Sequence, residues 1–226
     1  MDTGLQSFIS NIELFQSEII SNKKIKDGVY LLTIKYNEKF IPGQVVGLSL
    51  NPKDPPRLYS IASAGSDQKI DILFNIKDGG SLTPQLSRLK ASDTIYISHP
   101  FGAFLGDDKP AWWIASGTGI APYRSMSLAG LYKNKKLIHG GRTLEDFYFY
   151  EEFKDLFGSN YIRCSSRLEH PEVFHGRITK YLEQQDHIPK DINYYLCGNS
   201  EMVVDVREIL ISKGVPFLNI MAEIYF

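Results

Sequence analysis

The chain has 226 residues, of which 43% are hydrophobic and 23% are charged, a balance typical of globular proteins. Its formal net charge of -1 gives no indication of a nucleic-acid partner or an acidic membrane surface. The 2 cysteines, Cys164 and Cys197, are too few for an iron–sulfur cluster, and they match no zinc pattern.

The N-terminal residues carry no targeting pattern. Residues 1–11 lack the basic and apolar regions of a signal peptide. No window of the sequence approaches the roughly 18 apolar residues of a membrane span. We therefore expect a cytoplasmic protein with reduced thiols.

The first half, from about Phe8 to Phe104, predicts short β-strands separated by turns. Segments 29–34, 70–76 and 94–98 are rich in β-branched and aromatic residues, and 70–76 alternates between apolar and polar positions. Turn residues such as Lys26-Asp27-Gly28 and Pro42-Gly43 separate these segments. Several short strands with regular turns predict a closed or nearly closed antiparallel β-barrel.

From Ala111 onward, predicted strands and helices alternate, and this order predicts a parallel sheet with helices on both faces. The expected strands are 112–115, 136–139, 161–164, 194–197 and 219–225, and the expected helices are 122–132, 149–157, one starting near Arg177, and 201–212. Gly106-Asp107-Asp108-Lys109-Pro110 is the expected linker. The predicted domains are therefore 1–106 and 107–226.

A glycine-rich segment, Gly117-Thr118-Gly119-Ile120-Ala121-Pro122, follows predicted strand 112–115 and opens the predicted helix. Glycines let the backbone approach a pyrophosphate, and a helix N-terminus offers free N–H groups to it. Proline stands where the third glycine of the usual dinucleotide fingerprint would lie, and proline suits the first turn of a helix. The segment is either a dinucleotide loop or an ordinary strand-to-helix turn.

Arginines follow successive elements of the second half. Arg142 comes after strand 136–139, where NAD-binding folds carry an acidic residue for the ribose hydroxyl. Ser166-Arg167 follows strand 161–164, and Arg177 comes directly after Gly176. Guanidinium groups pair with phosphate through several donors at once, so such a cluster favours a 2′-phosphate. Any one of these arginines alone would be interpreted as a solvated surface charge.

Two motifs of the first half carry further candidates. On one strand, Arg57 and Tyr59 would share a face and Ser60 would point to the other. This arrangement could hold a phosphate and stack on a flat ring, or it could be an edge strand with a core tyrosine. Gly79-Gly80-Ser81-Leu82-Thr83-Pro84 places small residues and hydroxyls before a predicted helix, as in an anion site or in a plain helix N-cap.

The order and spacing of these motifs resemble the ferredoxin–NADP reductase family over nearly the whole chain, from about Ile9 to Phe226. The matching features are R-x-Y-S, G-G-S-L-T-P, G-T-G-I-A-P, C-G-x-x-x-M and an acidic–aromatic C-terminus, with Pro42-Gly43-Gln44 before them. The resemblance implies an FAD-binding antiparallel β-barrel followed by a Rossmann-like NADP-binding α/β domain. It also implies hydride transfer between NADPH and FAD, and single-electron transfer between FAD and a separate ferredoxin or flavodoxin.

The resemblance assigns a flavin site to the first half. Arg57 would hold the flavin phosphate, Tyr59 would stack on the isoalloxazine, and Ser60 would lie near the flavin N5. Ile61 and Ala62 would supply backbone contacts to the ring. The complete implied flavin site, including the pyrophosphate cradle of the second motif, is Arg57, Leu58, Tyr59, Ser60, Ile61, Ala62, Gly80, Ser81, Leu82 and Thr83.

The resemblance assigns the nicotinamide site to the second half. Cys197 would lie beside the reacting nicotinamide, Glu223 would lie near the site, and Tyr225 would cover the flavin. Phe226 is an extra residue relative to members that end at the tyrosine, so which ring moves aside stays open. With Ser60, the residues Cys197, Glu223 and Tyr225 are the expected catalytic group. The other implied contacts are Gly117, Thr118, Gly119, Pro122, Arg142, Ser166, Arg167, Arg177, Gly198 and Phe226.

Three other functions compete with this one. A free-flavin reductase would use flavin as a diffusing substrate, whereas G-G-S-L-T-P and the C-terminal aromatic residues favour tightly held FAD. The reductase half of an oxygenase is normally fused to an iron–sulfur domain, for which the chain has no cysteine motif. A non-catalytic electron-transfer protein would keep the fold for binding alone. We expect a cytoplasmic, monomeric flavoprotein oxidoreductase that binds no metal, nucleic acid or membrane.

Overall fold

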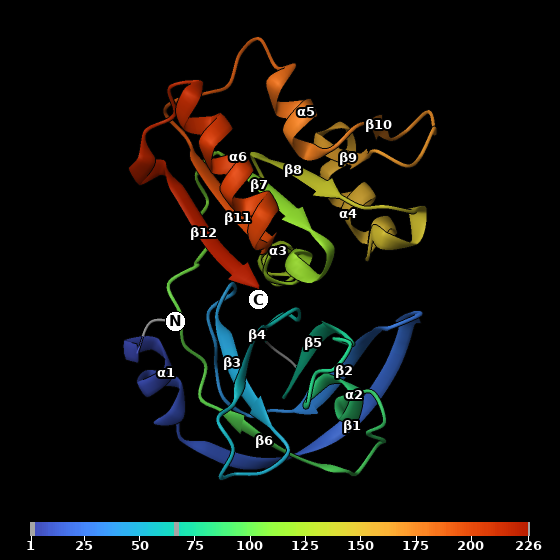
Figure 1. The fold of residues 1–226 in the computed structure, drawn as a ribbon, viewed down its shortest axis with the longest axis vertical. Coiled ribbons are helices and arrows are strands. Elements are labelled where there is room, and N and C mark those ends of the chain that lie inside the picture. Colours follow the sequence, from blue (N-terminus) through green and yellow to red (C-terminus); the bar gives the residue numbers. More distant parts are fainter. Residues whose placement is uncertain (1–2, 66–67, 226) are drawn as a thin grey trace. The chain divides into compact units, whose positions relative to one another are not determined.

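The computed structural model describes residues 3–65 and 68–225, and the chain forms two compact units (Figure 1). The first unit contains Met1–Leu105 and Arg124–Ala129, and the second contains Gly106–Tyr123 and Gly130–Phe226. Within the described residues, no helix is long and apolar enough to cross a lipid bilayer.

The first unit is built on an antiparallel sheet of 6 strands in the order β4-β3-β6-β1-β2-β5. The strands are β1 (Leu14–Lys26), β2 (Val29–Lys35), β3 (Val45–Ser49), β4 (Arg57–Ser60), β5 (Lys69–Asn75) and β6 (Thr94–Ser98). Its two edges meet at a bridge between Ile61 and Ile72, where the Ala62 N–H donates to Asp71 O at 2.8 Å. The predicted antiparallel barrel is confirmed.

Strand β1, the long blue strand in Figure 1, pairs with both β6 and β2. Its first part, Leu14–Glu18, pairs with β6, and the part from Ile19 onward pairs with β2. A register shift between Ile19 and Ser21 marks a bulge, which lets a strand bend from one partner toward another. Alternate side chains of the strands fill the interior of the barrel, among them Leu32, Ile34, Ile70, Ile72 and Phe74.

Two helices accompany the barrel, α1 (Thr3–Ser10) and α2 (Thr83–Leu86). The strand-like interpretation from Phe8 onward was wrong at its start, because residues 8–10 belong to α1. An amphipathic pattern of 8 residues is too short to separate a helix from a strand reliably. In α2, Pro84 occupies the first turn, where its missing N–H leaves no helical bond unmade.

The second unit is built on a parallel sheet of 6 strands in the order β10-β9-β8-β7-β11-β12. The strands are β7 (Ala111–Ser116), β8 (Lys135–Gly140), β9 (Tyr161–Ser165), β10 (Phe174–His175), β11 (Asn193–Asn199) and β12 (Ile220–Tyr225). Every recorded pairing in this sheet is parallel. The predicted α/β architecture is confirmed.

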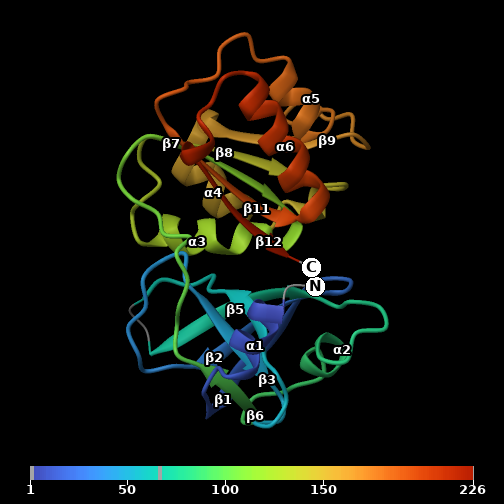
Figure 2. The same ribbon diagram turned by 60° about the vertical axis from the view of Figure 1, so that its left-hand side comes forward.

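Helices cover both faces of the parallel sheet (Figure 2). Successive strand residues point to opposite faces, so Trp112 packs with α5 (Ile178–Glu183) and α6 (Ser200–Ser212), whereas Trp113 packs against Phe157 of α4 (Tyr150–Phe157). Short 3₁₀ helices lie at Gly117–Ile120, Leu144–Asp146, Gly158–Asn160 and Phe217–Asn219.

Helix α3 (Ala121–Leu128) is shorter than the predicted helix 122–132. Gly130 adopts a φ of 85°, a left-handed conformation that ends helices. The contacts of α3 are also divided, because Ala121–Tyr123 groups with the second unit and Arg124–Leu128 with the first.

Candidate functional site

Strand β4 carries the arginine–tyrosine–serine motif. Arg57 is exposed and Tyr59 is half-buried on the same face, whereas Ser60 on the opposite face is only 2% exposed. The Tyr59 ring packs against the barrel core. Burial raises the pKa of Tyr59 to about 12, an effect that the nearby Arg57 only partly offsets. At neutral pH the motif therefore presents an exposed cation beside an uncharged aromatic ring.

The backbone after Ser60 is already bonded within the protein. The Ile61 N–H donates to Gln44 O at 3.0 Å, and the Ala62 N–H donates to Asp71 O at 2.8 Å. The Ala62 carbonyl accepts from the Arg124 guanidinium at 3.0 Å. We expected Ile61 and Ala62 to contact the flavin ring through their backbones, but both of their N–H groups already donate hydrogen bonds within the protein. A carbonyl oxygen has two lone pairs, so the carbonyls keep acceptor capacity for a ligand.

The Gly79–Pro84 motif forms a tight loop before α2. The Thr83 hydroxyl accepts from Lys77 N–H at 2.9 Å, and Gly80 N–H donates to Lys77 O at 2.9 Å. A Cβ at Gly80 would lie 2.9 Å from that same oxygen, so only glycine fits. The N-cap residue of α2 is Leu82, which makes no side-chain cap bond. The N-cap interpretation of this motif is therefore wrong, because the Thr83 hydroxyl closes the loop instead.

The second glycine motif lies between β7 and α3. Gly117 adopts a φ of 55°, and a Cβ at Gly119 would lie 2.3 Å from Cys197 O. A Cβ at Gly198 would lie 2.3 Å from Ser116 Oγ. The loop after β7 and the end of β11 thus approach each other backbone to backbone. The structure brings these candidates together at the carboxyl ends of two adjacent strands, with Thr118 half-buried and Pro122 buried beside them.

Cys197 and Glu223 are register partners on adjacent strands β11 and β12. The Cys197 Sγ lies 3.9 Å from Glu223 Oε2, and the thiol side chain is fully buried. In the same unit, the buried Tyr123 hydroxyl donates to Tyr195 O at 2.7 Å and lies 3.2 Å from Ile114 O. Burial raises the pKa of Tyr123 well above its ordinary value, and the neighbouring Cys197 and Glu223 raise it further.

Ser116 and Asn199 join the two strand ends, and sequence reasoning identified neither. The Asn199 amide donates to Ser116 Oγ at 3.1 Å, and its Oδ1 accepts from Met202 N–H at 2.8 Å as the N-cap of α6. An asparagine just before a helix is a recognisable cap signal, so Asn199 could have been found. Ser116 had no such signal.

The candidate phosphate-binding side chains lie in three loops that meet at Ser165. The buried Ser165 hydroxyl donates to Arg142 O and accepts from Arg167 N–H, both at 3.2 Å. The Gly176 N–H, directly before Arg177, donates to Ser165 O at 2.9 Å. Arg142, Arg167, Arg177 and the neighbouring Ser166 are all exposed. Sequence reasoning did not single out Ser165, which holds these loops together.

One arginine of this group has an acidic neighbour. Arg177 Nη1 lies 3.4 Å from Glu201 Oε1, and the two side chains are 71% and 75% exposed. An exposed ion pair of this kind contributes only about 0–1 kcal/mol. The Arg142 loop is held separately, because Asp146 Oδ2 accepts from Arg142 N–H at 2.9 Å and from Thr143 N–H at 3.0 Å.

The C-terminal candidates are only partly described. The Tyr225 backbone pairs with Asn199 at the end of β12. Phe226 lies outside the described residues. Among the described residues, no group of three or more histidine, cysteine, aspartate or glutamate side chains is arranged to hold a metal ion.

Residues 113–208 match the family model described as the oxidoreductase NAD-binding domain. The toluate 1,2-dioxygenase electron transfer component of Pseudomonas putida is 26% identical over 224 residues, which cover 92% of this chain and 67% of that protein. A component of the Na(+)-translocating NADH-quinone reductase of Methylococcus capsulatus is 30% identical over 197 residues, covering 74% of this chain and 48% of that protein.

Among solved structures, a ferredoxin NADP+ reductase from Neisseria gonorrhoeae, crystallised with bound FAD and NADP, has a TM-score of 0.83 and 22% identity. The likeness covers 95% of this chain and 99% of that chain. The curated relatives are longer, since the matched regions span 48% to 67% of the two proteins named above.

Proposed function

We propose that this chain, which has the fold of the ferredoxin–NADP reductases and carries an oxidoreductase NAD-binding domain at residues 113–208, moves electrons between NADPH and a separate one-electron redox protein through bound FAD. Ferredoxin or flavodoxin is the proposed partner.

The close approach of the Gly117–Gly119 loop to Cys197–Gly198 carries this proposal. Ligands of open α/β sheets bind outside the carboxyl ends of the strands, and β7 and β11 end here. Because neither Gly119 nor Gly198 has room for a Cβ, the loop and the strand end pack backbone to backbone, and we infer that together they form a continuous backbone surface. A surface of this kind fits a dinucleotide, whose pyrophosphate binds backbone N–H groups.

The loops joined at Ser165 support NADP(H) rather than NAD(H). Arg142, Arg167 and Arg177 are exposed cations in three loops that bond to one buried serine, through Arg142 O, Arg167 N–H and the Gly176 N–H that precedes Arg177. A phosphate group can replace Glu201 as the partner of Arg177 at small cost, because that ion pair is exposed. Guanidinium forks match phosphate oxygens in pairs, which suits the 2′-phosphate of NADP(H).

The residues of the first unit fit a flavin. Arg57 offers an exposed cation for the phosphate, Tyr59 offers an uncharged ring face, and the Gly80–Thr83 loop offers a tight turn whose closure leaves no room for a Cβ at Gly80. A flavin, when bound, accepts hydride from nicotinamide and releases electrons singly.

In the second unit, the Cys197 thiol is fully buried beside the Glu223 carboxylate. Reactive cysteines lie in electropositive, partly exposed surroundings. We therefore assign Cys197 and Glu223 to positioning the nicotinamide, and not to covalent catalysis.

A second candidate is the reductase part of another electron-transfer system, such as an oxygenase. It is favoured by the 26% identity to the Pseudomonas putida dioxygenase component. The 30% identity to a component of an NADH-quinone reductase likewise supports NADH as the electron donor in this second candidate. The nicotinamide preference and the electron acceptor therefore separate the two candidates.

The first test is a visible absorption spectrum of the purified protein, followed by anaerobic titration with NADPH and then with NADH. We expect a yellow protein whose flavin band is bleached by NADPH at lower concentration than by NADH. Preferential bleaching by NADH would favour the second candidate. A colourless protein that oxidises NADPH only after free flavin is added would indicate a flavin reductase. No flavin binding and no oxidation would indicate a non-catalytic electron-transfer protein.

The arginine assignment has its own test, the double variant Arg167→Ala with Arg177→Ala. Charge-assisted hydrogen bonds to a phosphate are each worth roughly 1.5–3 kcal/mol, so the NADPH-to-NADH ratio of kcat/KM should fall by at least about tenfold. Arg88→Ala, which removes an exposed arginine of the first unit, is the control and should leave the ratio unchanged. An unchanged ratio in the double variant would show that the 2′-phosphate is bound elsewhere.

A further inference from the structure

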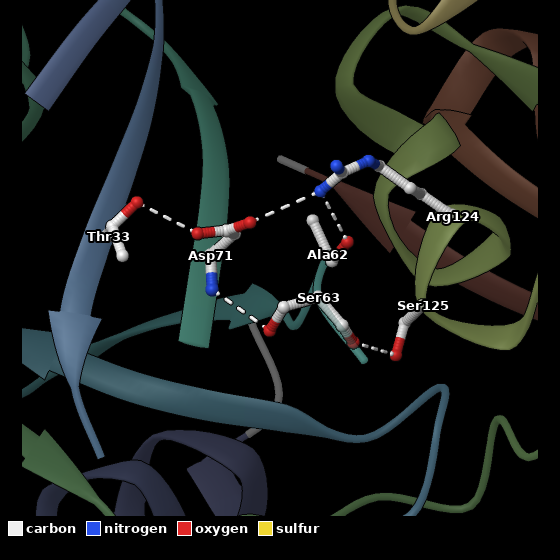
Figure 3. Close-up of polar contacts among 6 residues, drawn as sticks. All are labelled: Thr33, Ala62, Ser63, Asp71, Arg124 and Ser125. Carbon is white, nitrogen blue, oxygen red and sulfur yellow. Dashed lines mark hydrogen bonds and ion pairs between the residues drawn. The ribbon is translucent and has the colours of Figure 1, made fainter. Parts of the chain in front are cut away.

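A polar network surrounds the backbone segment that directly follows the candidate flavin strand (Figure 3). The Arg124 Nη1 donates to Ala62 O at 3.0 Å and to Asp71 Oδ2 at 3.2 Å. The other carboxylate oxygen, Asp71 Oδ1, accepts from the Thr33 hydroxyl at 2.8 Å. The Arg124 and Asp71 side chains are only 13% and 15% exposed. The ion pair is thus largely shielded from water and fixed by neighbours on both sides.

The same segment is bonded at its next residue. The Ser63 hydroxyl accepts from Asp71 N–H at 3.0 Å, and Ser63 O accepts from the Ser125 hydroxyl at 2.8 Å. In Figure 3, Asp71 lies between Thr33 and Arg124, and Ser125 of the same helix points toward Ser63. The helix segment that supplies Arg124 and Ser125 belongs to the first unit. Residues of β2, β5 and α3 therefore converge on the short stretch 61–63.

This stretch needs side-chain support because it lies beyond the regular ladder. Strand β4 ends at Ser60, and only the isolated Ile61–Ile72 bridge continues the pairing. Without the guanidinium, Ala62 O would lose this side-chain donor, and 61–63 would be held by the Ile61 and Ala62 N–H bonds and the two serine bonds. The planar fork of arginine can hold a carbonyl and a carboxylate together in fixed positions.

Stability alone is a weak reason to keep such a pair. Burying two charges costs desolvation energy that their attraction only partly offsets, and uncharged replacements of similar size are often as stable. Positional control is the better-supported reason where the held group must meet a ligand, because small displacements of a binding site cost affinity and rate.

We propose that Arg124 and Asp71 are positioning residues for the flavin, which fix the backbone at Ile61–Ser63 so that it meets the ring edge in one defined geometry. This inference rests on the proposed flavin-binding function. Neither side chain contacts the flavin in this scheme. Arg124 acts through Ala62 O, and Asp71 acts by orienting Arg124 and by bonding to Ser63 through its own backbone N–H.

The test compares Arg124→Met with the double variant Arg124→Met, Asp71→Asn in the flavin-bound 226-residue chain. Flavin is removed from each protein, and the apoprotein is titrated with FAD by flavin fluorescence. The flavin midpoint potential, the positions of the visible absorption bands and the urea unfolding midpoint are also measured. Arg88→Met is the matched control, since it removes an exposed arginine of the first unit.

The single variant leaves a shielded carboxylate unpaired, so we expect both a lower unfolding midpoint and flavin binding weakened by about tenfold or more. The double variant removes both charges. It should regain most of the unfolding midpoint yet keep the weakened flavin binding and a shifted midpoint potential, because Ala62 O still lacks its donor. If flavin binding and potential recover together with stability, the pair is structural only and the inference is overturned. A wild-type protein that binds neither FAD nor FMN would overturn the proposed function itself.

Discussion

His139 is a buried, uncharged side chain at the carboxyl end of β8. Its ring is fully buried, with Nδ1 3.0 Å from the Tyr161 hydroxyl and an edge-on contact to Phe147. Among the described residues, no hydrogen-bond partner is recorded for its Nε2. Burial lowers the pKa of His139 to about 3; Asp146 opposes this shift and Arg163 adds to it. Folding therefore keeps this imidazole neutral at pH values where an unfolded histidine is protonated.

This shift predicts an acid-sensitive component of stability. Between its unfolded pKa near 6.5 and its folded pKa of about 3, the unfolded chain binds one proton more than the folded chain. The free energy of unfolding should therefore be fully retained above about pH 6.5 and fall as the pH drops, by up to about 1.4 kcal/mol per pH unit from this group. Urea unfolding from about pH 7 down to about pH 4.5 measures the slope.

The variant His139→Gln removes the titrating group and should flatten this acid dependence, whatever its effect on stability at neutral pH. His187→Gln, at an exposed histidine, is the control and should keep the wild-type slope. A wild-type slope in His139→Gln would mean that other groups cause the acid sensitivity.

Among the elements, the turn after β7 packs against the end of β11 so closely that no side-chain atom fits between them. A methyl group at Gly119 would lie 2.3 Å from Cys197 O and 2.6 Å from Gly198 Cα, both backbone atoms that cannot rotate away. Gly119→Ala should lower the free energy of unfolding by about 1–3 kcal/mol and weaken NADPH binding, because the strand end or the loop must shift. Gly65→Ala meets its nearest atom at 3.5 Å and should change stability by no more than about 0.5 kcal/mol. Equal effects of the two substitutions in urea unfolding would contradict the close approach.

The elements that sequence reasoning identified are those with strong local patterns. Strand β6 was predicted at its observed bounds, and β7 was recognised from its apolar run, because period and β-branched content act within a few residues. Helix α1 and the 2-residue strand β10 are too short for such patterns, and β10 exists only through its pairing with β9.

The candidate site divides in the same way. The residue pattern pointed to the Gly117–Gly119 loop and the resemblance pointed to Cys197, and the structure brings their backbones together. The contacts that position these groups were not predictable, since they join residues far apart in the chain. Ser116 and Asn199 are separated by 83 positions, and Asp71 and Arg124 by 53. Local sequence periodicity does not indicate such pairs. In the sequence alone, a serine or aspartate that bonds to a distant part of the chain cannot be told from one on the surface.

Across the whole chain, neither of the two units is one continuous stretch of sequence. Arg124–Ala129 belongs to the first unit, although 106–123 belongs to the second. Within the first unit, a Cβ at Gly43 would lie 2.1 Å from Phe104 O and 2.5 Å from Met126 Cε, so this helix segment packs tightly on the barrel residues. A fragment that ends at the predicted boundary, residue 106, would lack Arg124, Ser125 and Met126.

Because such a fragment lacks Arg124, we predict that Asp71→Asn shifts the urea unfolding midpoint of the fragment in the opposite direction from that of the 226-residue chain. In the 226-residue chain, this substitution removes the negative charge opposite the largely buried Arg124 guanidinium, so the urea midpoint should fall. In a fragment of residues 1–106, the Asp71 carboxylate is itself the unpaired charge, so the same substitution should raise the midpoint or the folded fraction. Both effects are measured by circular dichroism during urea unfolding of the 226-residue chain and the fragment, each with and without Asp71→Asn. If Asp71→Asn shifts the unfolding midpoint in the same direction in the chain and in the fragment, Arg124 is not the residue that offsets the cost of burying the Asp71 charge.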